Sequence, residues 1–310
     1  MESKNINLCL ILDDTNISDV NRRELKHILE GTDSYINHVL VDETTAHTKK
    51  ENKTSNENTE RSGINWRHFK KFFEVIRSEG APALLQAERH LARTLDQEYM
   101  DWLSEEFDTI SEQHNIYSFP EIDESKVKYF KPLETEGAFY EFPENIVERV
   151  SEDCDVALLL GFNRLISGEI LDAPEWGILS YHWSDIRKYR GRPGCLWQYL
   201  NNESKIGFSI QRLTENIDGG SLIHCEHTNI ESARTWQEVR LRATKIKGTG
   251  LFTESIRKLK DPEFSSENLD EEDLGILTHS SDKERWTVIL RVIAKNINNR
   301  YIKDTGSWRR

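Results

Sequence analysis

The chain has 310 residues, of which 36% are hydrophobic, and its formal net charge is −13. This length and composition allow a sizeable buried core, and the acidic balance argues against nonspecific binding to nucleic acid. No apolar run approaches the roughly 20 residues that cross a membrane, and the apolar run near the N-terminus is too short for a signal peptide. The sequence therefore predicts a cytoplasmic protein with no membrane partner.

The first third of the chain predicts strands that alternate with helices. Residues 5–12 are expected to form a buried strand and residues 35–41 a second strand, and a helix is expected between them over residues 21–30. A polar stretch without periodicity follows at residues 45–63, where an exposed loop or disordered insert is expected. Apolar residues then recur at helical spacing in two stretches over residues 64–102.

The remaining elements continue the alternation. A short strand is expected at residues 127–130, a helix at 145–150 and a central strand at 155–160, whose aliphatic run suits a parallel strand covered on both faces. The later elements are expected to be strands at residues 177–181, 205–213 and 221–227 and a helix over residues 234–260.

This order predicts an α/β fold with a largely parallel sheet and flanking helices. We expect an α/β domain over residues 1–262, with the chemistry carried by residues 150–260. Residues 263–282 are acidic and polar, as in a linker or surface loop, and residues 283–310 predict a short C-terminal helix with a basic tail.

Polar residues follow several of the predicted strands. Ligands of open α/β sheets bind beyond the carboxyl ends of the strands. Three segments are expected to leave such ends, namely Gly161–Arg164, Ser180–His182 and Asp218–Gly220. If they converge, a carboxylate beside the histidine would hold the imidazolium form and orient the ring. The residues alone predict no more than such a pocket.

Three motifs in the second half of the chain resemble those of the folate-dependent formyltransferases. They are G-F-N-R-L-I at residues 161–166, S-Y-H-W-S-D-I-R-K-Y-R-G at 180–191 and D-G-G at 218–220. Their order, spacing and neighbours resemble this family over residues 150–260. The resemblance implies a Rossmann-like formyltransferase fold and a formyl donor, 10-formyltetrahydrofolate, that passes its formyl group to an acceptor amine.

The resemblance also implies roles for individual residues. His182, held protonated by Asp218, would stabilise the tetrahedral oxyanion, and Asp218 would help to relay the amine proton. The pteridine would lie against the backbone of two loops. The residues implied in folate binding are Phe162, Asn163, Arg164, Leu165, Ile166, Thr214 and Ile217.

Ser180 departs from the family pattern, which has asparagine two residues before the histidine. A serine hydroxyl is shorter than the asparagine amide, and losing one such donor typically costs about 3 kcal/mol. Either a water or a neighbour such as Asn163 supplies the donor, or the protein is a poor or inactive enzyme. The alternatives to a formyltransferase are therefore a formyltetrahydrofolate hydrolase and a catalytically impaired folate-binding protein.

The acceptor is expected to be a small amine, with an amino sugar carried on a nucleotide favoured by elimination. Transfer RNA is not favoured because the chain is acidic and has little room after residue 262. Glycinamide ribonucleotide is not favoured because no glycine-rich phosphate loop follows the first strand, whereas one does in the purine enzyme that the chain resembles. Association into a homo-oligomer stays open. Arg187, Lys188, Arg190 and Arg192 could meet a diphosphate or the folate glutamate tail, or pair with surface carboxylates.

The sequence H-C-E-H at residues 224–227 has metal-ligating residue types, but no metal site is expected there. Alternation along a strand sends His224 and Glu226 to one face and Cys225 and His227 to the other. The four cysteines form no C-x-x-C pair, and reduced thiols are expected.

Overall fold

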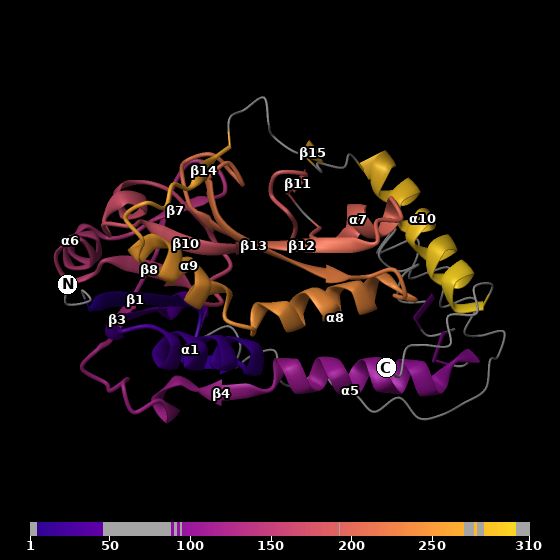
Figure 1. Cartoon of the computed structure of the whole chain (residues 1–310), viewed down its shortest axis with the longest axis horizontal. Coiled ribbons are helices and arrows are strands. Elements are labelled where there is room, and N and C mark those ends of the chain that lie inside the picture. Colours follow the sequence, from indigo (N-terminus) through magenta and orange to yellow (C-terminus); the bar gives the residue numbers. More distant parts are fainter. Residues whose placement is uncertain are drawn as a thin grey trace.

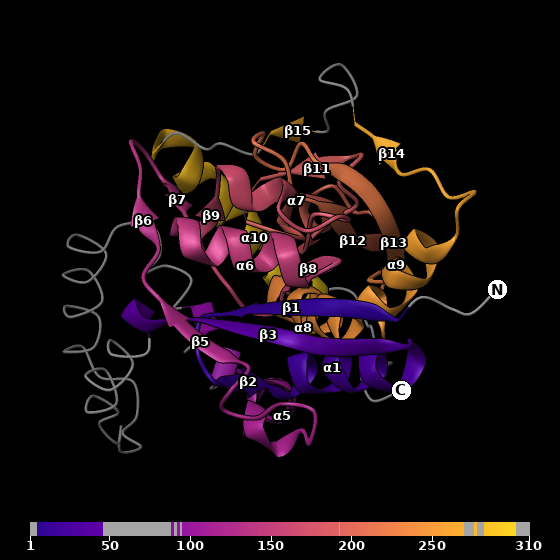
Figure 2. The ribbon, with the colours of Figure 1, turned by 90° about the vertical axis from the view of Figure 1, so that its left-hand side faces the viewer.

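The fold is an α/β sandwich with a sheet between two layers of helices (Figures 1 and 2). The computed structural model describes residues 5–45, 88–89, 92–93, 95–191, 193–269, 276–277 and 282–301. The polar stretch expected at residues 45–63, apart from Thr45, and most of the helical stretch expected over 64–102 lie outside these residues.

The central sheet has eight strands in the order β14-β13-β12-β10-β8-β1-β3-β5. The five strands from β10 to β5 pair in parallel, whereas β12, β13 and β14 add an antiparallel edge. The predicted fold class, a largely parallel Rossmann-like sheet with flanking helices, is confirmed. The strands are β1 (Ile6–Leu12), β3 (Ser34–Asp42), β5 (Val127–Phe130), β8 (Val156–Leu159), β10 (Ile178–His182), β12 (Lys205–Arg212), β13 (Ser221–Asn229) and β14 (Glu267–Asn268).

Three small sheets flank the central one. They pair β2 (Asn16–Ser18) with β4 (Gln113–Asn115), β7 (Phe139–Glu141) with β6 (Leu133–Glu134) and β9 (Leu165–Ile166), and β11 (Tyr189–Arg190) with β15 (Ile276–Leu277).

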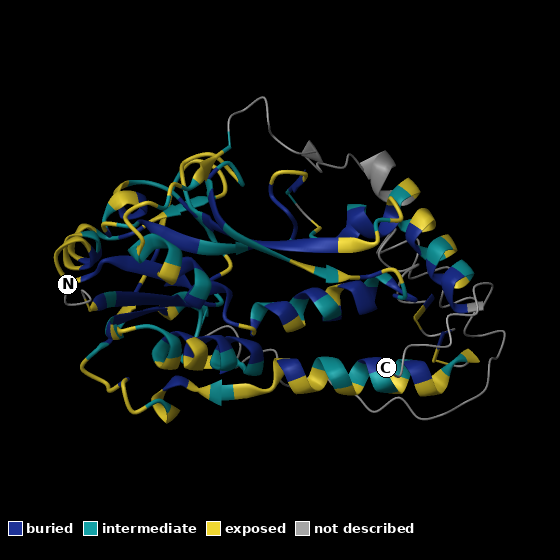
Figure 3. Cartoon of the chain, in the orientation of Figure 1, coloured by how far each residue is buried: buried dark blue, intermediate teal, exposed yellow. Residues whose placement is uncertain are grey.

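Apolar side chains cover the sheet on both faces, which matches the continuous apolar character of its central strands. Leu8 and Leu10 of β1 pack into one core, which helices α1 (Asp19–Gly31), α8 (Trp236–Lys247) and α9 (Leu251–Lys260) complete. Cys9 and Ile11 point to the second core, which is completed mainly by α6 (Glu144–Asp153) and the short 3₁₀ helix η3 (Glu169–Asp172). The buried residues lie mainly in the strands and on the helix faces turned toward them (Figure 3).

The remaining helices lie outside these layers. Helix α5 (Gln97–Ser111) packs against α1 and α8 through Tyr99 and Leu103. A short 3₁₀ helix, η2 (Ile116–Ser118), follows β4. Helix α7 (Leu196–Leu200) contacts the C-terminal helix α10 (Asp282–Tyr301), which lies at the end of the molecule far from β1 (Figure 1). No helix among the described residues is long and apolar enough to span a membrane.

Two predicted elements differ from the structure. The single helix expected over residues 234–260 is two helices, because Gly250 adopts a φ of +97°, which side-chain-bearing residues rarely adopt and which ends regular α-helix. Residues 263–282, expected as a linker, contribute β14 to the central sheet and β15 to the pair with β11. Backbone hydrogen bonds to the exposed sheet edge can recruit such short polar segments, which carry no strand pattern of their own.

Candidate active site

His182 is the last residue of β10, and Asp218 lies in the turn between β12 and β13. The structure brings the two side chains together, with the imidazole Nδ1 3.3 Å from the Asp218 Oδ1. The His182 side chain is only 6% exposed and that of Asp218 is 21% exposed. The pair therefore lies largely out of water, where an electrostatic interaction is stronger than at the surface.

The segment between β10 and α7 folds back over this pair and contacts both members. The backbone carbonyl of Tyr189 lies 2.9 Å from the His182 Nε2, and the backbone N–H of Gly191 donates to the Asp218 Oδ2 at 2.8 Å. Both ring nitrogens of His182 thus face acceptor oxygens. Only a doubly protonated imidazole can donate to both of them at once.

The pKa of Asp218 reflects this environment. Burial by itself would raise the pKa of the carboxyl group, but the hydrogen bond and charge of His182 and the N–H of Gly191 lower it to about 2. The side chain of Gln211 is a further hydrogen-bond partner that lowers it. Asp218 is accordingly a carboxylate at neutral pH.

Asp218 reaches His182 by a different route from the one expected. The sequence prediction placed the turn after β12 at the same sheet edge as His182. Strand β12 instead runs antiparallel to β10, with Arg212 beside Leu179 and Ser209 beside His182. The C-terminal end of β12 therefore lies next to the N-terminal end of β10, away from His182. The turn after β12 therefore has to fold back along the sheet for Asp218 to meet the imidazole.

Ser180 lies on the same face of β10 as His182, since residues two apart in a strand point the same way. Its hydroxyl lies 3.4 Å from the carbonyl oxygen of Tyr181. The residue directly opposite Ser180 in β12 is Gln211, a buried amide. Gln211 hydrogen-bonds Asp218, and its Oε1 has no hydrogen-bond partner among the described residues. The sequence analysis missed Gln211, because only the β10–β12 register places it in the site.

The loop implied in folate binding is held by its own contacts. Phe162 is 7% exposed and packs against Phe130 and Phe142 in the second core, so its ring is structural. The amide of Asn163 donates to Asp13 at 2.5 Å and to the carbonyl of Gly161 at 3.2 Å. The structure therefore gives Asn163, our expected substitute for the missing amide, partners other than His182. Leu165 and Ile166 form β9 and pair with β7.

Thr214 and Ile217 lie in the turn that carries Asp218, and both side chains are exposed. Glu215 of the same turn accepts a hydrogen bond from the backbone N–H of Gly168 at 2.9 Å. This contact ties the turn to the segment that follows β9. The two loops implied in folate binding are thus neighbours in the structure.

Arg164 is an anchor of this loop. Its Nε donates to the Asp42 Oδ2 at 2.6 Å, its second donor reaches the hydroxyl of Thr44 at 2.6 Å, and its guanidinium lies 4.3 Å from the centroid of the Tyr140 ring. The Asp42 side chain is fully buried. Burial lowers and the Asp42 carboxylate raises the pKa of Arg164, with a net upward shift.

Replacing Arg164 with alanine is expected to lower the free energy of unfolding by about 2 kcal/mol, because it leaves the buried Asp42 charge without its cation. Urea denaturation measures this. The exposed Arg149 on α6 is the matched control, and its alanine variant should change stability by less than about 0.5 kcal/mol. Equal stabilities of the two variants would contradict the structural role of Arg164.

The basic residues after His182 are not equivalent. Arg187 donates to both oxygens of Asp185, at 2.8 and 2.9 Å. Arg190 is 1% exposed and donates its Nε to the carbonyl of Ile186, and burial lowers the pKa of its guanidinium although the charge of Asp218 opposes this. The expectation that these two arginines are open to a diphosphate is therefore not favoured. Arg192 lies outside the described residues, and Lys188 lines a pocket.

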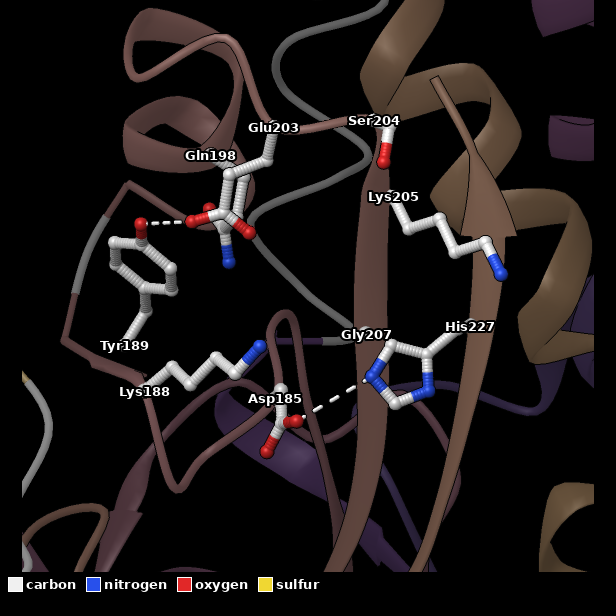
Figure 4. Close-up of a pocket in the computed structure, with 9 residues that line it drawn as sticks. All are labelled: Asp185, Lys188, Tyr189, Gln198, Glu203, Ser204, Lys205, Gly207 and His227. Carbon is white, nitrogen blue, oxygen red and sulfur yellow. Dashed lines mark hydrogen bonds and ion pairs between the residues drawn. The ribbon is translucent and has the colours of Figure 1, made fainter. Parts of the chain in front are cut away.

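This pocket has a volume of about 340 Å³ and lies beside the loop that covers His182 (Figure 4). Tyr189 contributes to both features, since it lines the pocket and its carbonyl oxygen faces His182. Lys188 extends into the space between Asp185 and the Glu203 side chain (Figure 4). The remaining lining residues are Gln198, Ser204, Lys205, Gly207 and His227.

A buried imidazole–carboxylate pair of this kind has the chemistry to stabilise a developing oxyanion and to accept or donate a proton. The family model for formyl transferases matches residues 123–254, which contain this pair. The resemblance predicted from the sequence is confirmed for this part of the chain, which is similar to the formyl transferases at low sequence identity.

Individual relatives agree with this at low identity. The methionyl-tRNA formyltransferase of Fusobacterium nucleatum is 25% identical over 134 residues, which are 41% of this chain and 43% of that protein. The GDP-perosamine N-formyltransferase of Brucella melitensis is 33% identical over 97 residues, which are 31% of this chain and 35% of that protein. The matched segments thus span less than half the length of these relatives.

Among solved structures, glycinamide ribonucleotide transformylase 1 from Symbiobacterium toebii aligns with 87% of this chain and 100% of its own, at 16% identity and a TM-score of 0.48.

Proposed function

We propose that the protein is an N-formyltransferase that moves the formyl group of 10-formyltetrahydrofolate to an acceptor amine. The observation that carries the proposal is the buried His182–Asp218 contact at 3.3 Å inside the segment that matches the formyl transferase model. The folate donor follows from the family resemblance of the loops at residues 161–166 and 214–218.

In this reaction a bond forms between the acceptor nitrogen and the formyl carbon, and the bond between that carbon and the folate N10 breaks. The amine loses a proton and N10 gains one. His182 supplies a positively charged donor for the oxygen that becomes negative in the tetrahedral state. Asp218 keeps the imidazole charged and oriented, and it accepts the amine proton directly or through water.

The loop that covers the His182–Asp218 pair has to move before the formyl oxygen can contact His182. In the structure the His182 Nε2 faces the Tyr189 carbonyl oxygen, so the nitrogen that would donate to the substrate already has a partner. Substrate binding would replace this carbonyl with the formyl oxygen. Hydrogen bonds of catalytic groups commonly take their productive geometry only once the substrate is bound.

The proposed acceptor is an amino sugar carried on a nucleotide. The relative with the highest identity among those described above acts, by its name, on GDP-perosamine. The pocket beside the loop adds a second reason, because Lys188 extends into it and Lys205 also lines it. Ammonium groups at such a position suit a phosphate-bearing ligand.

The test is to mix the protein with 10-formyltetrahydrofolate and to follow the folate absorbance with and without candidate acceptors. Release only with an amine supports the transferase. Release without any amine means the hydrolase, and binding without release means the impaired folate-binding protein. A screen of nucleotide-linked amino sugars and small amines by mass shift then identifies the acceptor.

A specific test concerns Ser180. Gln211 stands directly opposite Ser180, and we propose that its amide takes over part of the role of the family asparagine. Replacing Ser180 with asparagine adds a donor at a site where one donor is worth about 10²-fold or more in rate. We expect kcat to rise about tenfold with little change in folate affinity, because the added interaction forms only in the transition state.

Steady-state kinetics and folate titration measure these two quantities. The control is Ser151→Asn on the exposed surface of α6, which should leave both unchanged. A fall in kcat for Ser180→Asn with unchanged folate affinity would show instead that the site is built around serine and that the longer side chain crowds it.

A further inference from the structure

Three potential metal ligands lie together two strands away from His182. The Asp185 carboxylate, the Cys225 thiol and the His227 imidazole each offer one atom, and all three atoms lie within 4.8 Å of one another. Asp185 is buried, Cys225 is half-buried and His227 lines the pocket together with Asp185. Figure 4 shows the Asp185 carboxylate and the His227 ring turned toward each other across the pocket wall.

The strand register places this cluster on the same face of the sheet as His182. Ser209 of β12 lies between His182 of β10 and Cys225 of β13 in one row across three strands. With neighbouring strands about 4.8 Å apart, Cys225 is about 10 Å from His182 along this row. His227 follows two residues further along β13 and therefore points to the same side as Cys225.

Asp185 reaches this face because β12 has a glycine there. Gly207 is opposite His227, and a Cβ atom at Gly207 would lie 2.6 Å from the Cβ and 2.9 Å from the Cα of Asp185. Any side chain at Gly207 would thus force the backbone of Asp185 off the strand. Because Gly207 has no side chain, the loop that carries Asp185 packs directly on β12, and the Asp185 carboxylate lies beside β13.

Ser209 fixes the loop from the other side of Asp185. Its hydroxyl donates to the carbonyl of Ser184 at 2.8 Å and accepts the N–H of Ile186 at 3.2 Å. Both neighbours of Asp185 are therefore held on β12, and the contact is buried. The three ligand atoms stand on a rigid support, which is what a metal site requires for pre-organised binding.

Arg187 does not exclude a cation here. It holds both carboxylate oxygens of Asp185, and its own charge is offset by Glu267, 3.7 Å away. Each carboxylate oxygen can accept more than one partner, and the Oδ2 already faces the His227 Nε2 at 3.3 Å. A cation between Asp185 and His227 would replace that contact, with Arg187 orienting the carboxylate as an outer partner.

From this geometry we propose that Asp185, Cys225 and His227 form a binding site for a zinc-type divalent cation. One thiolate, one imidazole and one carboxylate are a ligand set that zinc accepts, and three protein ligands leave a fourth position for water at the pocket. Tetrahedral zinc needs donor atoms about 3.3–3.8 Å apart. The distances between the ligand atoms therefore have to shorten by about 1.5 Å at most.

The test uses the full chain, freed of metal by a chelator, and titrates it with Zn²⁺ by calorimetry and with Co²⁺ by absorbance. We expect one equivalent of either ion, and a near-ultraviolet thiolate-to-cobalt band. Cys225→Ser should abolish this band, and both Cys225→Ser and His227→Ala should weaken binding by about 100-fold or more. Circular dichroism confirms that the variants fold, and the half-exposed His227 provides a test that does not disturb the core.

The matched control is His224→Ala. His224 is in the same strand, but its Nδ1 faces the Lys258 ammonium group rather than Asp185, so zinc affinity should change less than about threefold. A wild-type chain that takes up neither ion would overturn the proposal, and so would a cobalt band that persists in Cys225→Ser or binding that is lost in His224→Ala. None of these measurements depends on formyl transfer, so the result stands apart from that of the proposed reaction.

Discussion

Replacing His182 with alanine is expected to lower kcat for formyl transfer by about 10³-fold, because it removes the only charged donor proposed for the oxyanion. The imidazole is buried and contacts both Asp218 and the Tyr189 carbonyl oxygen, so its loss also leaves these two oxygens without that partner. Folate affinity should change little, since the interaction forms mainly in the transition state. Single-turnover kinetics and a folate titration measure the two effects.

The control for this variant is His27→Ala, at an exposed position on α1. It should keep the full rate. A His182→Ala variant that folds, binds folate and retains a rate within tenfold of the wild type would remove His182 from the mechanism.

The second large effect is expected for Asp218→Asn, which keeps the shape of the side chain but removes its charge. Without the carboxylate, His182 loses the partner that favours the imidazolium, and the amine proton loses its acceptor. We expect kcat to fall by about 10²-fold or more. Asp172→Asn is the control, because Asp172 makes only a surface contact with Arg212 and its side chain is 83% exposed.

Asp218 also predicts a pH dependence of stability. Its pKa in the folded chain is about 2, below the 3.8 of a free aspartate, so folding favours the ionised form. The resulting stabilisation, about 2 kcal/mol, is fully present above about pH 4 and is lost as the pH falls toward 2. Urea denaturation between pH 5 and pH 2.5 should show a steeper loss for the wild type than for Asp218→Asn. Parallel curves would show that the His182 contact does not hold the carboxylate ionised.

Much of the fold was predictable because its strands are local patterns. β8 is apolar at every position, and β1 and β3 carry apolar residues on both sides of the strand with few polar ones between them, which is typical of strands covered on both faces. The break between α8 and α9 was missed, since their apolar periodicity continues across it and only the backbone geometry of Gly250 reveals the end of α8.

The burial and the partners of the basic residues after His182 could not be predicted from the sequence. Arg187 and Arg190 were predicted to meet a diphosphate or the folate tail, or to pair with surface carboxylates. Arg187 does pair with a carboxylate, that of Asp185, whereas Arg190 is buried against a carbonyl group. A charged residue in a polar stretch has no periodic pattern from which its burial can be read. The partners of such a residue depend on how the loop packs on the sheet. This packing depends in turn on Gly207 and Ser209, which belong to strand β12.

The motifs alone were enough to predict the family resemblance, because they keep their order and spacing along the chain, and the pairing of His182 with Asp218 was predicted only through that resemblance. It also determined that Cys225 and His227 share a face, since alternation is a local property of a strand. Only the tertiary structure placed Gln211 opposite Ser180 and Asp185 beside Cys225 and His227. These contacts depend on the antiparallel register of β12 and on the loop that packs against Gly207. Neither feature produces a recognisable pattern in the sequence around the residues that come into contact.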